Sequence, residues 1–118
     1  MTNNDREAEQ IEVTPSSGNV FADLGFDEPE LELAKARLAL AISQAIEERH
    51  LTQVEAGELT GLDQPRVSAI MRGRLGGFSI ERLFRTLNAL GRDVDIAVRT
   101  SQDARQARLT VRVESMTA

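Results

Sequence analysis

The sequence predicts a mainly α-helical domain with a C-terminal β-strand or β-hairpin and a disordered acidic N-terminal arm. Three observations favour this fold class. Apolar residues recur every three or four positions in residues 31–46, which is the spacing of one helix face. Thr52 and Glu55 then have the spacing of a capping box, ahead of two short segments that meet at Gly61. From Asp93 onward the apolar period changes to two, as in a half-buried strand.

The composition limits the chemistry open to the chain. With 118 residues and 41% apolar content, it is long enough for one small core. It has no cysteine and a single histidine, His50, at the predicted end of a helix. We therefore expect no enzyme activity, no metal site and no cofactor. No apolar run is long enough for a membrane span and no signal peptide opens the chain, so we expect a cytoplasmic protein without membrane partners.

Residues 1–27 are predicted to form a flexible acidic arm without a core of its own. Residues 1–32 contain nine acidic groups and one basic group, a net charge of −8, whereas residues 33–118 contain ten acidic and thirteen basic groups, a net charge of +3. An apolar cluster in the arm is the candidate partner-binding segment: Val20, Phe21, Leu24 and Phe26. Two interpretations remain equal: the cluster docks on the following helix, or it folds onto a partner.

Residues 28–92 are predicted to form a bundle of four helices, the first of which begins at Glu28-Pro29-Glu30. Its predicted buried stripe is Leu31, Ala34, Leu38, Ala41, Ile42, Ala45 and Ile46, and its predicted solvent face is Glu32, Lys35, Arg37, Gln44, Glu47 and Glu48. Ser79 caps the last helix, which Gly91 ends. Its apolar side is Ile80, Leu83, Phe84, Leu87 and Leu90.

Residues 51–74 read as two short helices joined by a tight glycine turn. Gly61 ends the first helix, because glycine takes the left-handed conformation readily, and Asp63 caps the second. Gly57 lies within the first helix, where glycine costs about 1 kcal/mol relative to alanine, so we expect the second helix to approach it closely. The residues expected at the contact are Ala56, Gly57, Leu59, Leu62, Val67 and Ile70.

The outer face of the second short helix carries residue types that read bases and phosphates, which predicts a helix-turn-helix DNA-binding domain. These residues are Gln64, Arg66, Ser68, Ala69 and Arg72. Between Asp63 and Arg92 there are six arginines against two acids. Two alternatives remain: a helical hairpin used only for packing and, for Arg82, Arg85 and Arg92, an ordinary solvated helix face.

Residues 93–118 are predicted to form two C-terminal strands that serve dimerisation. The apolar alternation is carried by Val94, Ile96 and Val98, and then by Leu109, Val111 and Val113. A lone two-stranded ribbon is marginal in water, so it needs helices beneath it or the ribbon of a second copy. Because helix-turn-helix proteins gain from reading two half-sites about 34 Å apart, we expect a homodimer.

Residues 16–99 resemble the XRE-type (Cro/repressor-like) helix-turn-helix proteins, and most closely the HigA-type antitoxins. The resemblance is carried by SSGNVFADLGFDEPELELAKARLALAI and by LTQVEAGELTGLDQPRVSAIMRGRLGGFSIERLFRTLNALGRDVDIAV. It implies a lambda-repressor-like bundle that binds an inverted-repeat operator in double-stranded DNA. It also implies an antitoxin that represses its own operon and neutralises a RelE/HigB-type ribonuclease toxin. The alternative is a stand-alone or phage-type repressor without a toxin partner.

The resemblance also implies the DNA-binding residues: Gln53, Gln64, Pro65, Arg66, Ser68, Ala69, Arg72 and Arg74. In such proteins a glutamine at the position of Gln53 contacts a phosphate and buttresses the base-reading glutamine at the position of Gln64. Arg72 and Arg74 would hold phosphates. Thr60 departs from the pattern, since many relatives carry a larger apolar residue there.

Overall fold

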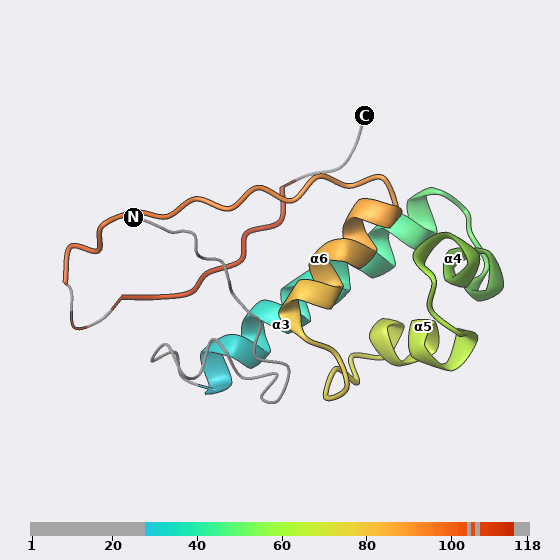
Figure 1. Cartoon of the computed structure of the whole chain (residues 1–118), viewed down its shortest axis with the longest axis horizontal. Coiled ribbons are helices and arrows are strands. Elements are labelled where there is room, and N and C mark those ends of the chain that lie inside the picture. The colour runs from blue at the N-terminus through green and yellow to red at the C-terminus, as the bar shows by residue number, and fades with distance from the viewer. Residues whose placement is uncertain (1–27, 104, 106, 115–118) are drawn as a thin grey trace, which may run out of the picture.

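The computed structural model describes residues 28–103, 105 and 107–114, and the regular structure of these residues is entirely helical. The helices are α3 (Glu28–Glu48), α4 (Gln53–Thr60), α5 (Gln64–Met71) and α6 (Ile80–Ala89). Helices α3 and α6 pack together, and the short helices α4 and α5 form a pair at one end of them (Figure 1). The candidate partner-binding residues Val20, Phe21, Leu24 and Phe26 lie outside the described residues.

The core lies between α3, the helix pair and α6. The stripe predicted for α3 is confirmed, because all seven of its members are buried. Leu83 of α6 and Leu90, which follows the helix directly, enter the same core and are 0% exposed. The solvent position predicted for Lys35 was wrong, since this residue is buried. It precedes the buried Leu38 and Ala39 by three and four positions, so its aliphatic stem lies at the edge of the stripe.

Capping determines where α4 begins and ends. The Thr52 hydroxyl accepts a hydrogen bond from the Glu55 N–H at 3.0 Å, and the Glu55 carboxylate accepts one from the Thr52 N–H at 2.8 Å. The predicted capping box is therefore confirmed. Gly61 ends the helix with a φ of 79°, a left-handed conformation that glycine adopts without steric cost. Its N–H donates to the Gly57 carbonyl at 2.8 Å and so satisfies one of the last free carbonyls of the helix.

A close approach at Gly57 is confirmed, but the turn before the second helix makes it and not the helix itself, which was predicted. A Cβ atom at this position would lie 2.5 Å from the carbonyl oxygen of Leu62 and 3.8 Å from Cγ2 of Val67. Of the residues predicted at this contact, only Leu59 was wrong, since it is 45% exposed. Leu59 follows Gly57 by two residues and therefore points to the opposite side of the helix. The remaining predicted contact residues are buried.

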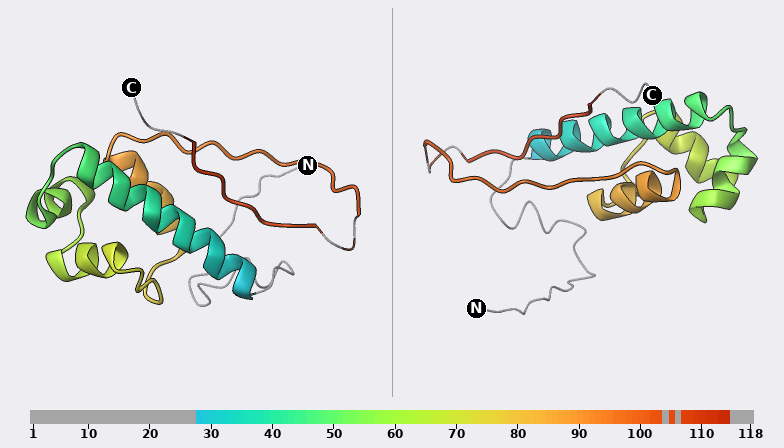
Figure 2. Two further views of the ribbon diagram at one scale, coloured as in Figure 1. Left: turned by 180° about the vertical axis from the view of Figure 1, so that it is seen from behind. Right: turned by 90° about the horizontal axis from the view of Figure 1, so that it is seen from above.

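The predicted C-terminal strands were wrong for the single chain. The described residues from 93 to 114 contain no strand, and no backbone hydrogen bond pairs the two halves of this stretch. Both halves run extended, one away from α6 and one back along α3 (Figures 1 and 2). Val94, Leu109 and Val111 pack against the core, but Ile96 and Val98 are 70% and 91% exposed. A strand pair whose apolar face is mostly uncovered is marginal, which explains why none forms.

Candidate nucleic-acid interface

Helix α5 presents its first turn to solvent. The Asp63 carboxylate caps the helix by accepting a hydrogen bond from the Arg66 N–H at 3.0 Å. Pro65 is tolerated in this first turn because the amides there have no partner within the helix. Gln64, Pro65 and Arg66 are all exposed. The buried side of the helix is supplied by Val67 and Ile70, so α5 is held by its inner face and leaves the first turn free.

The Arg66 side chain is held against the aromatic ring of Phe78. Its guanidinium carbon lies 5.8 Å from the centre of the Phe78 ring, a cation–π arrangement. Phe78 is itself buried and follows the glycine pair of the 75–78 loop. This contact gives Phe78 a role in positioning Arg66 that sequence reasoning missed. The two residues lie twelve positions apart in different elements, and no local pattern links them.

Gln53 opens α4, as the resemblance implied, but in the structure its side chain contacts a residue other than Gln64. Gln53 is half-buried, and its Nε2 atom is 3.9 Å from Sδ of Met71, the last residue of α5. Thioether sulfur is a weak acceptor. No hydrogen bond joins Gln53 to Gln64 among the described residues. Gln53 therefore braces the end of α5 in the DNA-free chain and does not buttress the glutamine that starts this helix.

The other predicted readers fall into two groups. Ser68 and Ala69 are half-buried, and Ala69 packs against the core, so only part of each is available to a ligand. Arg72 and Arg74 are exposed and follow directly on the end of α5. The structure thus brings exposed arginines to both ends of one short helix, with Gln64 at its start.

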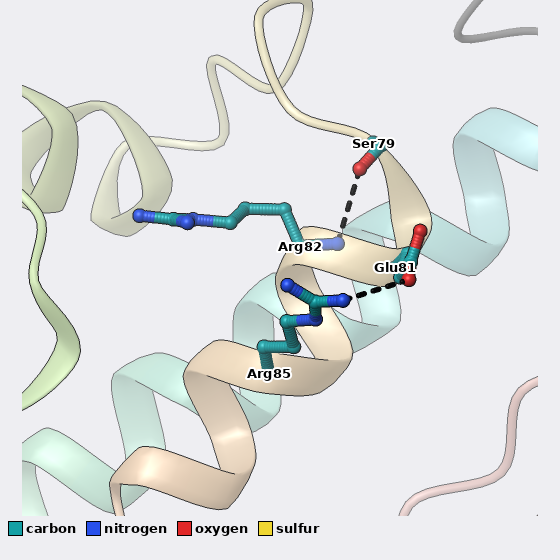
Figure 3. A network of polar contacts seen from close by, with 4 residues as sticks. All are labelled: Ser79, Glu81, Arg82 and Arg85. Atoms are coloured by element: carbon teal, nitrogen blue, oxygen red, sulfur yellow. Dashed lines mark hydrogen bonds and ion pairs between the residues drawn. The ribbon is translucent and has the colours of Figure 1, made fainter. Parts of the chain in front are cut away.

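The three arginines for which a solvated face remained possible have different surroundings. Arg85 forms an ion pair with Glu81 at 3.1 Å, and Arg92 forms one with Glu48 of α3 at 2.8 Å. The N–H of Arg82 donates to the Ser79 hydroxyl, but its guanidinium has no ion-pair partner among the described residues. Figure 3 shows the Arg82 side chain extended away from Glu81 and Arg85. Arg82 is therefore the strongest candidate of the three for a phosphate contact.

The described part of the chain offers few sites for other ligands. A small apolar cavity of about 10 Å³ lies between the four helices. It is lined by Ile42, Ile46, Ala56, Thr60, Leu62, Val67, Ile70 and Thr86. Among the described residues no cluster of three or more His, Asp or Glu side chains is placed to hold a metal ion. None of the helices in the described residues is both long enough and apolar enough to cross a membrane.

Comparisons with known proteins agree with this geometry. A family model described as a helix-turn-helix domain matches residues 20–99. A solved structure described as "Putative XRE Family Transcriptional Regulator" is 39% identical, with a TM-score of 0.69. The match covers 75% of this chain and 100% of that one. No curated protein matches the chain significantly.

Proposed function

Because the chain belongs to the XRE-type helix-turn-helix family, we propose that it is a transcriptional regulator that binds double-stranded DNA through α5. The observation that carries the proposal is the solvent-exposed first turn of α5, with Gln64 and Arg66 on it and Arg72 and Arg74 beyond its end. α4 packs against this helix, and the turn between them comes too close to Gly57 for a Cβ atom.

The roles of the residues follow from the major-groove chemistry of each side chain. Gln64 has the amide that pairs with the N6 and N7 atoms of adenine, and Arg66 has the guanidinium that pairs with O6 and N7 of guanine. Pro65 offers an apolar surface to a thymine methyl group. Ser68 and Ala69 lie one turn later and form the edge of the contact. Gln53, Arg72 and Arg74 contact phosphates, which position the helix without reading sequence.

The regulator binds an inverted repeat as a homodimer in this proposal. One α5 helix covers only a few base pairs, so two copies related by a two-fold axis are needed for a specific site. The arginines around each α5 add a binding energy that does not depend on base sequence.

Selection of bound sequences from a random DNA pool tests the proposal, followed by titrations of the selected site at several salt concentrations. Gln64→Ala is expected to lose base preference at one position in each half-site. Arg72→Ala is expected to weaken binding to all sequences and to lower the salt slope by about 1. Arg108→Ala is the matched control, since Arg108 is exposed in the extended segment of residues 107–114, which runs back along α3 (Figure 1). Recovery of no enriched sequence, or equal losses for Arg72→Ala and Arg108→Ala, contradicts the proposal.

For the biological role, we propose an antitoxin that represses its own operon and neutralises a RelE/HigB-type ribonuclease toxin. The charge distribution supports this role, because a segment with a net charge of −8 suits a basic RNA-cleaving partner. A stand-alone or phage-type repressor is the second candidate, and the family match of residues 20–99 supports both.

Co-expression of the tagged chain with the products of its neighbouring genes separates the two candidates. An antitoxin is expected to co-purify with a small basic protein that arrests growth when expressed alone. Deletion of residues 1–27 should then abolish rescue from this toxin and leave operator binding unchanged. A homodimer that binds its operator without any neighbouring gene product identifies the stand-alone repressor.

A further inference from the structure

The contact between Gln53 and Met71 joins the first residue of α4 to the last residue of α5. The Nε2 atom of Gln53 donates to Sδ of Met71, and the two atoms lie 3.9 Å apart. Both residues are half-buried, and Met71 follows the buried Ile70 and precedes the exposed Arg72. The contact therefore lies at the boundary between the core and the surface assigned to DNA.

The strength of this hydrogen bond depends on the acceptor at residue 71. A thioether sulfur is a weak acceptor, so it holds the Gln53 amide only loosely. Nε2 is the only donor atom of the Gln53 side chain, and it is therefore also the atom that donates to a phosphate oxygen in the proposed function. A phosphate oxygen is charged and is a much stronger acceptor than the thioether. With an unmodified Met71, the amide is thus free to move to the phosphate when DNA binds.

We propose that Met71 is a modification site, at which oxidation to the sulfoxide lowers the affinity for DNA by holding the Gln53 amide at the end of α5. This inference rests on the proposed function and adds a regulation of the same surface. Oxidation converts the apolar thioether into a polar group whose oxygen accepts hydrogen bonds. The Gln53 N–H then has a strong acceptor within the protein, and this acceptor competes with the phosphate.

The oxidant is a peroxide, and the reaction transfers one oxygen atom. A lone pair of Sδ forms the S–O bond while the O–O bond of hydrogen peroxide breaks, and the second oxygen leaves as water after taking up the proton of the first. Sulfur is oxidised by two electrons and the peroxide is reduced by two. The chain has no cysteine to compete for the oxidant, and its other methionines, Met1 and Met116, lie outside the described residues. Half-burial leaves part of Met71 open to this small reagent.

The position of Met71 directs the effect to Gln53. Met71 packs against the core from its edge, whereas Val67 and Ile70 supply the buried face of α5. The sulfoxide therefore adds a polar group at the edge of the core and not at its centre. Oxidation adds no charge, so the release of counterions on DNA binding does not change. Because a phosphate contact reads no sequence, the expected result is a uniform loss of affinity with the same base preference and the same salt slope.

Titration of the selected DNA site before and after treatment with hydrogen peroxide tests the proposal. Oxidation of Met71, verified by mass spectrometry of its peptide, should lower the affinity about three- to tenfold, which corresponds to one hydrogen bond. Methionine sulfoxide reductases should restore the affinity. Met71→Leu keeps an apolar side chain of similar size, and its affinity should not respond to peroxide. This variant retains Met1 and Met116, so it also controls for their oxidation.

Gln53→Ala separates the proposed contact from a simple loss of packing. This variant lacks the amide, so oxidation of its Met71 should cause no further loss of affinity. An equal loss in oxidised Gln53→Ala, or in peroxide-treated Met71→Leu, overturns the proposal. A Met71 that peroxide does not oxidise, or that is oxidised without any loss of affinity, overturns it as well. Circular dichroism of the oxidised chain should show an unchanged helix content, and a loss of helix would assign the effect to unfolding.

The Gln53 amide also supplies a measurement that does not require DNA. Its side-chain proton signals in nuclear magnetic resonance spectra should move on oxidation, because the N–H exchanges a weak acceptor for a strong one. Unchanged signals overturn the contact, whatever the chain binds. Moved signals in a chain that binds no DNA in either form show that the contact is made and that the proposed function is the part that fails.

Discussion

Gly57 and Leu62 come so close that a Cβ atom on Gly57 would lie 2.5 Å from the Leu62 carbonyl oxygen. The obstacle is backbone, which cannot rotate away as a flexible side chain can. Gly57→Ala is therefore expected to destabilise the fold by about 1 to 3 kcal/mol in urea titrations followed by circular dichroism. Gly76→Ala is the matched control, because nothing lies within 4 Å of its Cβ position and its φ is not positive. Equal stability of both variants would show that the helix pair can separate at no cost.

The contact between Arg66 and Phe78 predicts an effect on DNA specificity. Phe78→Leu keeps an apolar side chain in the loop but removes the ring face that holds the guanidinium at 5.8 Å. Discrimination at the base pair read by Arg66 should fall by about 0.5 to 1 kcal/mol, measured by titrating operators substituted at each position. Phe84→Leu, on α6 and packed against the core, is the control for lost aromatic volume. The same loss in both variants would assign the effect to packing.

Arg82 and Arg85 provide a comparison of two arginines on one helix. The Arg85 charge is balanced by Glu81, whereas Arg82 extends away from this pair (Figure 3). Arg82→Ala is therefore expected to lower the slope of log affinity against log salt by about 1, as for the loss of one phosphate contact. Arg85→Ala should leave the slope unchanged. A smaller slope for Arg85→Ala than for Arg82→Ala would reverse the assignment.

Replacement of His50 by glycine is expected to stabilise the fold. His50 ends α3 with a φ of 55°, a conformation that costs a residue with a Cβ about 1 to 2 kcal/mol. The N–H groups of His50 and Leu51 donate to the carbonyls of Glu47 and Ile46, which is the Schellman pattern that glycine usually completes. His50→Gly should therefore raise the free energy of unfolding by about 1 kcal/mol. Gly91 occupies the same position after α6, and Gly91→Ala should lower it by a similar amount.

The helices were predictable because their ends are set by neighbouring residues. Thr52 with Glu55, Asp63 with Arg66, and Ser79 with Arg82 each lie within one turn, and all three caps form as expected. The close approach at Gly57 was also predictable, since glycine destabilises a helix interior and its presence indicates that a larger side chain does not fit there. These features depend on sequence separations of a few residues.

The features that sequence reasoning missed depend on distant parts of the chain. Leu59 and Lys35 are exceptions, because helical spacing by itself accounts for the exposure of the first and the burial of the second. The strands were expected because alternation shows which residues could share a face, but it does not supply a second strand or a covering layer. The position of Arg66 over Phe78 and the ion pair of Arg92 with Glu48 likewise join separate elements.

The exposure of Ile96 and Val98 in the single chain has a consequence for how the regulator responds to its own abundance. Under the proposed homodimer, a copy at low abundance exists mainly alone, and the number of pairs rises with roughly the square of the amount of protein. A twofold fall in abundance then removes about three quarters of the pairs, and with them most of the occupied inverted repeats. The occupancy of the operator by such a regulator therefore changes more steeply than the amount of the protein when its synthesis or degradation changes.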